Sequence, residues 1–401
     1  MKYKLEDICI KITDGSHFSP KDNKNSVIPM YSVKDMREFN FDMYNCKHIS
    51  EEDYIKLLAQ DCVPKKNDIL VAKDGSYLKE IFVNEIEDKK AILSSIAIFR
   101  PNLNIVNPYF LCYLLKSPEI SNYTKENCVS GSAIPRIVLK DFKKIELDIP
   151  EICIQNKIVK ILKKINEKII ANTHTNNNLY EILDNIFKEK YLNNERYNSW
   201  EEVTLDDITS KFATGLNPRK NFVLGHGSNY YVTIKNMQNN NVILNDKCDK
   251  IDDEAILKIN RRSDLKVGDL LFSGIGTIGR VYLIKDVPYN WNISESIFTI
   301  RPNEKCSSEF LYLLLLNKNM QNYAVNKASG SVQKGIRMAD LKQFKVKLPT
   351  NNEMQDFTDI IKPIIDRIYN KTKQNEKLEI IRNTLLPKLM NGEIDLDKIE
   401  V

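Results

Sequence analysis

The sequence predicts an α+β protein made by internal duplication. We expect two similar mixed α/β globular domains, separated by two long helices that pair as an antiparallel coiled coil about a pseudo-twofold axis. Three observations predict this fold: a repeat that spans most of the chain, a mixture of strand-like and helix-like segments within each copy, and a heptad pattern of apolar residues after each copy.

The repeat has an offset of about 200 residues, as Leu5 and Leu205 show. The segment "LEDICIKITDG" at 5–15 returns as "LDDITSKFATG" at 205–215. Likewise, "GSAIPRIVLKDFKKIELDIP" at 131–150 returns as "GSVQKGIRMADLKQFKVKLP" at 330–349. This period is far longer than that of solenoid repeats, so it indicates a duplication of whole domains.

Within the first copy, short segments alternate between strand and helix signals. "DILVAK" at 68–73 and "EIFVNEI" at 80–86 are typical of strands around a turn, and "AILSSIAIFRP" at 91–101 is typical of one buried strand. Asn107 is expected to cap a helix that has Pro108 in its first turn. Alternating apolar and polar residues near the end of each copy predict a closing strand.

A heptad pattern follows each copy. Apolar residues lie at 154, 158, 161, 165, 169, 179, 183 and 186, in steps of three and four once positions 172 and 176 are included. The second copy has similar spacing, with apolar residues at 357, 361, 364, 368, 378, 385 and 389. So narrow a stripe can hardly bury itself against a globule, and it favours pairing of the two helices; the alternative is that each helix packs on its own domain. The polar residues expected near the middle of the pair, where they would fix its register, are Asn172, Asn176, Lys371 and Asn375.

These patterns divide the chain into four parts. They are a first domain at 1–150, a central spacer helix at 151–194, a second domain at 195–350 and a C-terminal spacer helix at 351–401. A helix of about 40 residues is roughly 60 Å long, which suits a spacer between two globules.

The segment "SGIGTIGR" at 273–280 has the spacing G-x-G-x-x-G of a dinucleotide-binding turn. That turn requires a helix after it, whereas "RVYLIKDV" at 280–287 favours a strand. The corresponding segment of the first copy, "AKDGSYLK" at 72–79, keeps only Gly75, opposite Gly276. We therefore expect a glycine-containing hairpin and no dinucleotide site.

Composition limits the class of protein. With 59 basic and 54 acidic residues the net charge is +5, which mildly favours a polyanionic partner. The apolar runs are far shorter than the ~20 residues of a membrane span, and no signal peptide is evident, so we expect a cytoplasmic protein that does not bind membranes. The eight cysteines form no C-x-x-C pair, which predicts reduced thiols without a bound metal.

In their order along the chain, the motifs of this sequence resemble those of the specificity (S) subunits of type I restriction–modification systems. The resemblance rests on "ITDGSHFSP" at 12–20, on the hairpins "NDILVAKDGS" at 67–76 and "GDLLFSGIGTIGRVYLI" at 268–284, and on the segments that end at Pro150 and Pro349. A glutamine then starts each helix, at positions 155 and 355. The resemblance covers essentially the whole chain.

The resemblance implies two target-recognition domains that read a bipartite sequence in double-stranded DNA, with a gap that is not read. It implies no active site and no cofactor in this chain. Two modification (methyltransferase) subunits would transfer a methyl group from S-adenosylmethionine to adenine in each part of the target. Restriction subunits, which translocate and cleave DNA, would use ATP and Mg²⁺.

The candidate DNA-binding residues are loop residues of these motifs, chosen because basic side chains suit guanine and phosphate, amides suit adenine, and aspartate suits cytosine. Each could instead be a solvated loop residue or a turn former. In the first copy they are Asp14, Ser16, His17, Lys73, Asp74, Ser76, Ser132 and Arg136. In the second copy they are Thr214, Asn217, Arg219, Lys220, Ser273, Thr277, Arg280, Ser331, Gln333, Lys334 and Arg337.

Other functions remain open at this level. A self-contained adenine methyltransferase would need an amide or carboxylate followed by two prolines and an aromatic residue, whereas "NPYF" at 107–110 has one proline and its copy is "SSEF" at 307–310. A nuclease could use "EIEDKK" at 85–90, although such runs are usually solvated. A tandem protein-interaction adaptor is a further alternative, and its binding should depend less on salt than DNA binding does.

Overall fold

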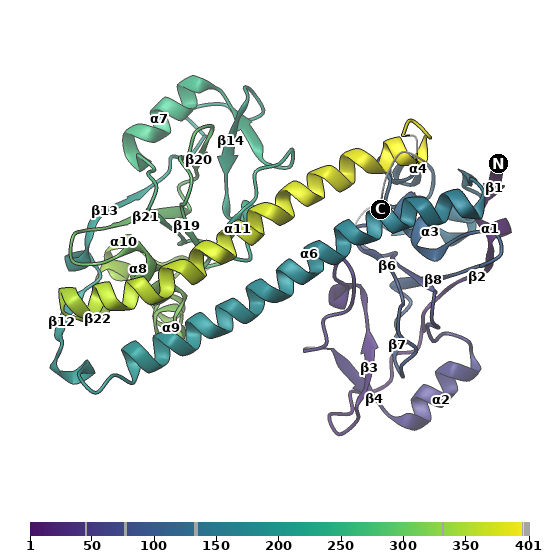
Figure 1. Ribbon diagram of the computed structural model, residues 1–401, viewed down its shortest axis with the longest axis horizontal. Coiled ribbons are helices and arrows are strands. Elements are labelled where there is room, and N and C mark those ends of the chain that lie inside the picture. Colours follow the sequence, from purple (N-terminus) through teal and green to yellow (C-terminus); the bar gives the residue numbers. More distant parts are fainter. Residues whose placement is uncertain (45, 76–77, 132–134, 331–332, 395, 397–401) are drawn as a thin grey trace. The chain divides into compact units, whose positions relative to one another are not determined.

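The computed structural model describes residues 1–44, 46–75, 78–131, 135–330, 333–394 and 396 (Figure 1). The chain divides into two compact units. Unit 1 contains Met1–Ile170 and Glu376–Val401, and unit 2 contains Ala171–Asn375. Each unit therefore combines one copy of the repeat with parts of both long helices.

The centre of unit 1 is a four-stranded antiparallel sheet with the order β2-β8-β5-β6. Its strands are β2 (Cys9–Asp14), β5 (Ile69–Ala72), β6 (Ile81–Val83) and β8 (Ile96–Pro101). β5 is buried along its whole length, which explains its continuous apolar sequence "ILVA". Asp14 pairs with Ala97 and Ala72 pairs with Ile96, so β2 and β5 end where β8 begins. We call this end of the sheet the loop end.

A smaller three-stranded sheet with the order β4-β3-β7 lies in the same unit. It contains β3 (Ile28–Tyr31), β4 (Lys47–Ile49) and β7 (Ala91–Ile92), and α2 (Glu51–Ala59) packs on it. The main sheet packs against α3 (Pro108–Leu115), whose N-cap residue Asn107 accepts a hydrogen bond from the Tyr109 amide at 2.9 Å, as predicted. The remaining elements are β1 (Lys2–Lys4), α1 (Leu5–Ile8), α4 (Pro118–Asn127), β9 (Val129–Ser130), β10 (Arg136–Ile137), α5 (Leu139–Phe142) and β11 (Glu146–Asp148).

Unit 2 repeats this topology, with sheets of order β13-β21-β18-β19 and β17-β14-β20. Thr214 pairs with Phe298 and Ser273 pairs with Ile297, which defines the equivalent loop end. The strands are β12 (Glu201–Thr204), β13 (Thr209–Thr214), β14 (Asn229–Val232), β15 (Met237–Gln238), β16 (Asn241–Val242), β17 (Asp249–Ile251), β18 (Leu270–Ser273), β19 (Val281–Leu283), β20 (Trp291–Ile293), β21 (Ile297–Pro302) and β22 (Lys345–Leu348). The shorter helices are α7 (Asp253–Ser263), α8 (Ser308–Leu316), α9 (Lys318–Lys327) and α10 (Met338–Lys342).

One predicted strand is wrong. Residues 91–101 form β7 and β8, which belong to different sheets, with a turn at 93–95 between them. The turn interrupts the apolar run because Ser94 and Ser95 are polar, and the Ser94 amide donates a hydrogen bond to Ser16 O at 2.8 Å. By contrast, β18 and β19 form an antiparallel hairpin, which confirms that the G-x-G-x-x-G segment is a turn between strands.

Both copies share an ion pair made by an arginine that precedes a proline, Arg100 in the first copy and Arg301 in the second. Arg100 donates from Nε and Nη2 to the two carboxylate oxygens of Asp68, each at 2.9 Å, and Arg301 does the same with Asp269 at 2.6 and 2.9 Å. Both aspartate side chains are 1% exposed, and these hydrogen bonds raise the pKa of each arginine. Each pair lies at the opposite end of its sheet from the loop end.

The two long helices are α6 (Ile152–Phe187) and α11 (Asn351–Met390). In unit 1, Ile158 and Leu162 of α6 share a core with Leu386 and Leu389 of α11. In unit 2, the α6 residues Leu183 and Phe187 share a core with the α11 residues Phe357, Ile361, Ile365 and Ile368. Polar contacts in unit 2 join Asn172 to Asn375 and Asn176 to Thr372, so residue numbers fall along one helix as they rise along the other. The antiparallel pairing is confirmed.

The predicted seam was too narrow, however. Val159 and Leu162 are buried in the core of the first globule, whereas Ile154, a predicted seam residue, is 38% exposed. Each helix packs both on the globule and on the other helix, so its buried face is wider than an a/d stripe. The heptad pattern favoured pairing of the helices over packing on the globules, but the helices do both. Among the described helices, α6 and α11 included, none is both long and apolar enough to cross a membrane.

Candidate nucleic-acid interface

At the loop end of unit 1, four loops are joined by backbone hydrogen bonds. The Gly15 amide donates to Ile96 O at 2.9 Å and the Lys73 amide donates to Ser95 O at 3.0 Å. The Gly75 amide donates in turn to Pro135 O at 2.8 Å. Three predicted loop segments, which are far apart in the sequence, therefore meet around the turn at 93–95.

Unit 2 assembles the same four loops. The Gly274 amide donates to Ser296 O at 2.9 Å, and the Gly276 amide donates to Lys334 O at 2.7 Å. The Ile336 amide donates back to Gly274 O at 2.9 Å. The loops at 214–220, 273–280, 294–296 and 333–337 thus form one surface, which corresponds to the surface of unit 1.

Two repeated glycines are needed for this convergence. A Cβ atom on Gly15 would lie 2.5 Å from Ile92 O, and one on Gly215 would lie 1.7 Å from Ile293 O, both far inside van der Waals contact. Gly75 and Gly276 have φ angles of 68° and 80°, in the left-handed region where glycine has no steric penalty. The duplicated sequence therefore keeps glycine where loop backbones cross or turn.

Several predicted site residues are buried and shape the loops. Ser16 is 2% exposed and hydrogen bonds Phe18 O at 2.7 Å, and Thr214 hydrogen bonds Gly215 O at 3.0 Å. The hydroxyl of Ser273, which is fully buried, donates to Thr277 O at 2.6 Å. Half-buried Arg280 donates from Nη1 to Ile234 O at 2.7 Å and to Met237 O. These side chains already have partners within the protein.

Asp14 and Lys73 bind each other at the loop end of unit 1. The Lys73 Nζ donates to Asp14 Oδ2 at 2.6 Å, and the lysine side chain is 10% exposed. His17 Nε2 lies 3.5 Å from the same oxygen, while its imidazole is 79% exposed. Asp14 and Lys73 therefore neutralise each other beneath an exposed histidine.

The other predicted residues lie at the surface of the two loop ends. Asp74 and Asn217 are half-buried. The exposed residues are Arg136, Arg219, Lys220, Thr277, Gln333, Lys334 and Arg337. Ser76, Ser132 and Ser331 lie outside the described residues. The exposed set is strongly basic and is held on loops whose backbones are fixed by hydrogen bonds, which suits contacts to phosphates and base edges.

Sequence reasoning missed the turn between the two sheets. In unit 2 this turn contains Glu295, whose carboxylate accepts hydrogen bonds from Asn217 Nδ2 at 2.6 Å and from the Tyr231 hydroxyl at 3.2 Å. A signal was present in the repeat, because "LSSI" at 93–96 and "SESI" at 294–297 both place polar residues just before a buried strand.

Comparison with known proteins identifies the family. The family described as "Type I restriction modification DNA specificity domain" matches residues 1–181 and again residues 197–380. The chain belongs to this family.

Sequence similarity between this specificity-domain chain and its relatives extends over most of their length. It is 24% identical to the HindI type I restriction enzyme specificity subunit of Haemophilus influenzae, covering 82% of this chain and 87% of the relative. It is also 24% identical to the MjaVIII specificity subunit of Methanocaldococcus jannaschii, covering 85% and 82%. The crystal structure of the type I S subunit from M. genitalium has the same fold, with a TM-score of 0.57 at 15% identity, and the match covers 97% and 95% of the two chains.

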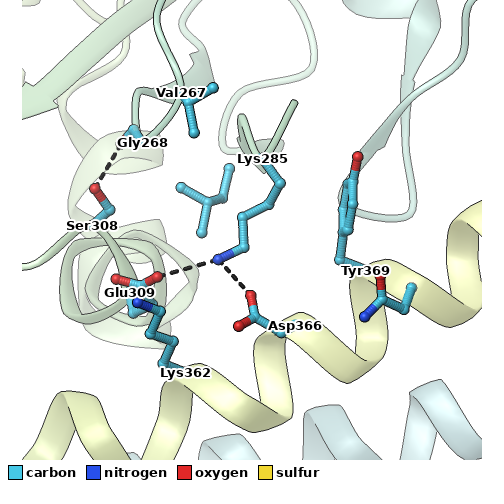
Figure 2. Close-up of a pocket in the computed structure, with 10 residues that line it drawn as sticks. Val267, Gly268, Lys285, Ser308, Glu309, Lys362, Asp366 and Tyr369 are labelled. Carbon is cyan, nitrogen blue, oxygen red and sulfur yellow. Dashed lines mark hydrogen bonds and ion pairs between the residues drawn. The ribbon is translucent and has the colours of Figure 1, made fainter. Parts of the chain in front are cut away.

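A separate cleft of about 430 Å³ lies in unit 2, where α11 passes α8 (Figure 2). Figure 2 shows Lys285 reaching between two carboxylates, with Nζ 3.2 Å from Glu309 and 2.7 Å from Asp366. The lysine charge is thus compensated within the protein. Lys285 and Gly268 lie at the end of the hairpin remote from the loop end, so in this specificity-domain protein the cleft is part of the junction between helix and globule.

The equivalent junction of unit 1 carries the opposite charges. Glu85 takes the place of Lys285, and its Oε1 lies 3.6 Å from Lys163 Nζ on α6. The Tyr109 hydroxyl donates to the same oxygen at 2.6 Å, and Lys163 lies 4.2 Å from the centre of the Tyr109 ring. Each helix is therefore matched by charge to the globule on which it packs.

Proposed function

We propose that this chain is the DNA-reading specificity subunit of a type I restriction–modification complex, and that each unit reads one part of a bipartite target. The observation that carries this proposal is that the specificity-domain family matches the chain twice, once on each copy. Both copies also bring the same four loops together at the loop end.

The chemistry of the loop ends supports DNA as the partner. The exposed arginines and lysines can neutralise phosphates, and Gln333 and Arg337 can reach base edges, where the major groove presents a different pattern for each base pair. Glycines at the crossing points let the loop backbones pack closely on one another. The two sets of loops differ in sequence, so the two parts of the target would differ too.

The helices suit the role of a spacer. α6 runs without interruption from Ile152 to Phe187, beginning in unit 1 and ending in unit 2, and α11 pairs with it inside each unit. Two DNA-reading domains in one chain, connected by helices, suit a target of two recognised segments, as half-site spacing does in dimeric DNA-binding proteins.

We propose that catalysis belongs to partner subunits: two modification subunits that use S-adenosylmethionine, and restriction subunits that use ATP and Mg²⁺. The segment that came nearest to a methyltransferase motif supports this, because Asn107 caps α3 and its Nδ2 donates to Asn156 Oδ1 at 2.8 Å. Two charged residues of the nuclease-like run at 85–90 also have partners outside it, since Lys89 pairs with Glu51 and Glu85 accepts a hydrogen bond from Tyr109.

The test is to express the chain together with the modification subunits of its host and to sequence the methylated adenines in the DNA. The expected result is one motif in two parts with a gap of constant length. The purified chain alone should transfer no methyl group. Methyl transfer by the chain alone, or a motif without a gap, would overturn the proposal.

A further inference from the structure

We propose that Glu295 is a base-reading residue of unit 2, whose carboxylate accepts a hydrogen bond from the exocyclic amino group of a DNA base. This inference rests on the proposed function and adds to it the chemical identity of one recognised position. Cytosine N4 and adenine N6 are the two amino groups that the major groove exposes.

Glu295 is held in a fixed place at the loop end. It lies in the turn between β20 and β21 and is half-buried. Asn217 Nδ2 donates to its Oε1 at 2.6 Å, and the Tyr231 hydroxyl lies 3.2 Å from its Oε2. The same hydroxyl lies 2.8 Å from Leu216 O, and Tyr231 is 2% exposed. Asn217, in the loop after β13, therefore orients the carboxylate, and the single hydroxyl proton of Tyr231 in β14 is shared between Glu295 and Leu216 O.

The Tyr231 hydroxyl, which supports Glu295, keeps its proton. Burial raises the pKa of Tyr231 far above its usual value, and the neighbouring carboxylate raises it further. The hydroxyl thus remains a donor at any physiological pH. Each carboxylate oxygen has a lone pair beyond the one that these donors use, so Glu295 can still accept from a ligand.

The surroundings of Glu295 indicate that its carboxylate does more than support the loops. Arg219, Lys220 and Lys334 are exposed on the adjoining loops, as expected for a surface that binds phosphates. Among the described ion pairs, none involves Glu295. A carboxylate without a cationic partner repels a polyanion, which weakens DNA binding unless the carboxylate meets a hydrogen-bond donor.

The base edges supply such a donor selectively. Cytosine and adenine present an amino group in the major groove, whereas guanine and thymine present only acceptors to a hydrogen-bonding partner there. A fixed carboxylate would therefore favour cytosine or adenine and reject the other two bases by repulsion between lone pairs.

The first copy lacks this group. Ile96 and Ile297 begin the equivalent strands, so Glu295 corresponds to Ser94. Of the two aspartates at the loop end of unit 1, Asp14 is bound to Lys73 at 2.6 Å, and Asp74 lies on the hairpin loop instead of in the turn between the two sheets. Glu295 should therefore affect only the part of the target that unit 2 reads.

The experiment compares the wild type with Glu295→Gln and Glu295→Ala in the complete complex with modification subunits, by sequencing methylated adenines. Competition with oligonucleotides that vary each position gives the same preference without catalysis. Glu304→Gln is the matched control, because Glu304 is exposed beyond the other end of β21. We expect one position in one part of the motif to lose its preference by about 10-fold or more, while the other part and the gap stay the same.

The identity of the affected position separates the two sources of the amino group. If the position is an adenine, replacing it by purine, which lacks N6, should weaken DNA binding by the wild type as much as the Glu295 substitution does. If it is a cytosine, replacing it by 2-pyrimidinone, which lacks N4, should have that effect. The Glu295 variants should bind DNA that contains the analogue as tightly as they bind unmodified DNA.

The inference would be wrong if the wild type recognises a bipartite motif and neither variant changes any position. It would also be wrong if the wild type binds equally well after the amino group of the affected base pair is removed with purine or 2-pyrimidinone. It would also be wrong if both parts weaken together with a lower unfolding temperature, since that indicates a role in folding. If the wild type shows no bipartite motif, the proposed function itself fails.

Discussion

Asn172 on α6 donates a hydrogen bond from Nδ2 to Gln374 Oε1 on α11 at 2.8 Å. The same nitrogen donates to Asn375 Oδ1 at 2.8 Å, and Lys371 Nζ donates to Asn172 Oδ1 at 3.1 Å. Asn172 is 1% exposed, so both ends of a buried amide are satisfied by the opposite helix. Only one alignment of the two helices provides these partners, which makes this polar layer a determinant of their register.

Replacing Asn172 by alanine should destabilise unit 2. The substitution removes three hydrogen bonds that the buried Asn172 side chain makes to α11, so the free energy of unfolding should fall by about 1–3 kcal/mol. Chemical denaturation measures the change. Asn177→Ala is the control, because Asn177 is exposed on the same helix. Equal stability of the two variants would contradict a role for the polar layer.

Lengthening both helices should change the gap in the DNA target. Seven residues inserted after Thr175 of α6, with seven inserted after Lys371 of α11, keep the heptad phase and add ~10 Å at 1.5 Å per residue. This corresponds to about three base pairs at 3.4 Å per base pair. Sequencing methylated adenines should show the same two recognised segments with a wider gap. A changed base preference in either segment would mean that the helices only support their own domains.

Asp61 should make unit 1 sensitive to acid. A hydrogen bond from Lys11 at 2.6 Å, together with the charge of Arg100, lowers the pKa of Asp61 from 3.8 to about 2 in the folded protein. A carboxyl group whose pKa is lower when folded stabilises the protein above its unfolded pKa, and this stabilisation is lost as the pH falls towards 2.

The Asp61→Asn variant should therefore be less stable than the wild type at pH 5, and the difference should shrink between pH 4 and pH 2. Thermal unfolding at a series of pH values measures it. Exposed Asp141→Asn serves as the control and should follow the wild type. A difference that stays constant over this pH range would show that the ion pair with Lys11 contributes nothing through its charge.

Arg219→Ala and Lys334→Ala should weaken DNA binding through the part of the target that unit 2 reads. A phosphate contact should lower affinity for all sequences and flatten the salt dependence, whereas a base contact should cost ~1–3 kcal/mol at one position. Fluorescence anisotropy at several salt concentrations distinguishes these cases. Lys305→Ala is the control, because Lys305 is exposed beyond the opposite end of β21. If Lys305 mattered more than the other two, the DNA would bind at the other end of the sheet.

Replacing Lys285 by methionine should destabilise the junction between α11 and the second globule. The substitution leaves the Glu309 carboxylate, whose side chain is 13% exposed, without its cation, next to Asp366. We expect a loss of about 1–3 kcal/mol in chemical denaturation. The double variant Lys285→Met with Glu309→Gln should recover part of it. DNA binding by the correctly folded fraction should stay unchanged, because this cleft lies away from the loop end.

The parts of the fold that depend on local sequence could be predicted. Asn107 caps α3 because its side chain and the following proline act within one turn. The duplication revealed the hairpin, since Gly75 and Gly276 are the glycine that both turns keep, at a position with a left-handed backbone. The antiparallel helix pair followed from the heptad pattern and from the polar residues placed in its middle.

Contacts between distant segments could not be predicted. Asp14 and Lys73 are 59 residues apart, so nothing in the sequence indicated that these two candidate DNA-binding side chains bind each other. Glu295 was missed because its counterpart is Ser94, and a single carboxylate beside a serine is common in loops. The face of α6 that holds Val159 and Leu162 was missed because periodicity cannot show that a helix contacts two neighbours at once.

The Arg100–Asp68 and Arg301–Asp269 pairs lie at one end of their sheets, and the loops of the candidate interface lie at the other. Mutations that alter the loops therefore leave the buried, doubly hydrogen-bonded ion pair of each domain intact. Such a protein can acquire a new target in evolution by exchanging short surface segments, with little risk of losing the folded state. The same separation makes each globule an exchangeable cassette, into which the loops of another family member could be grafted.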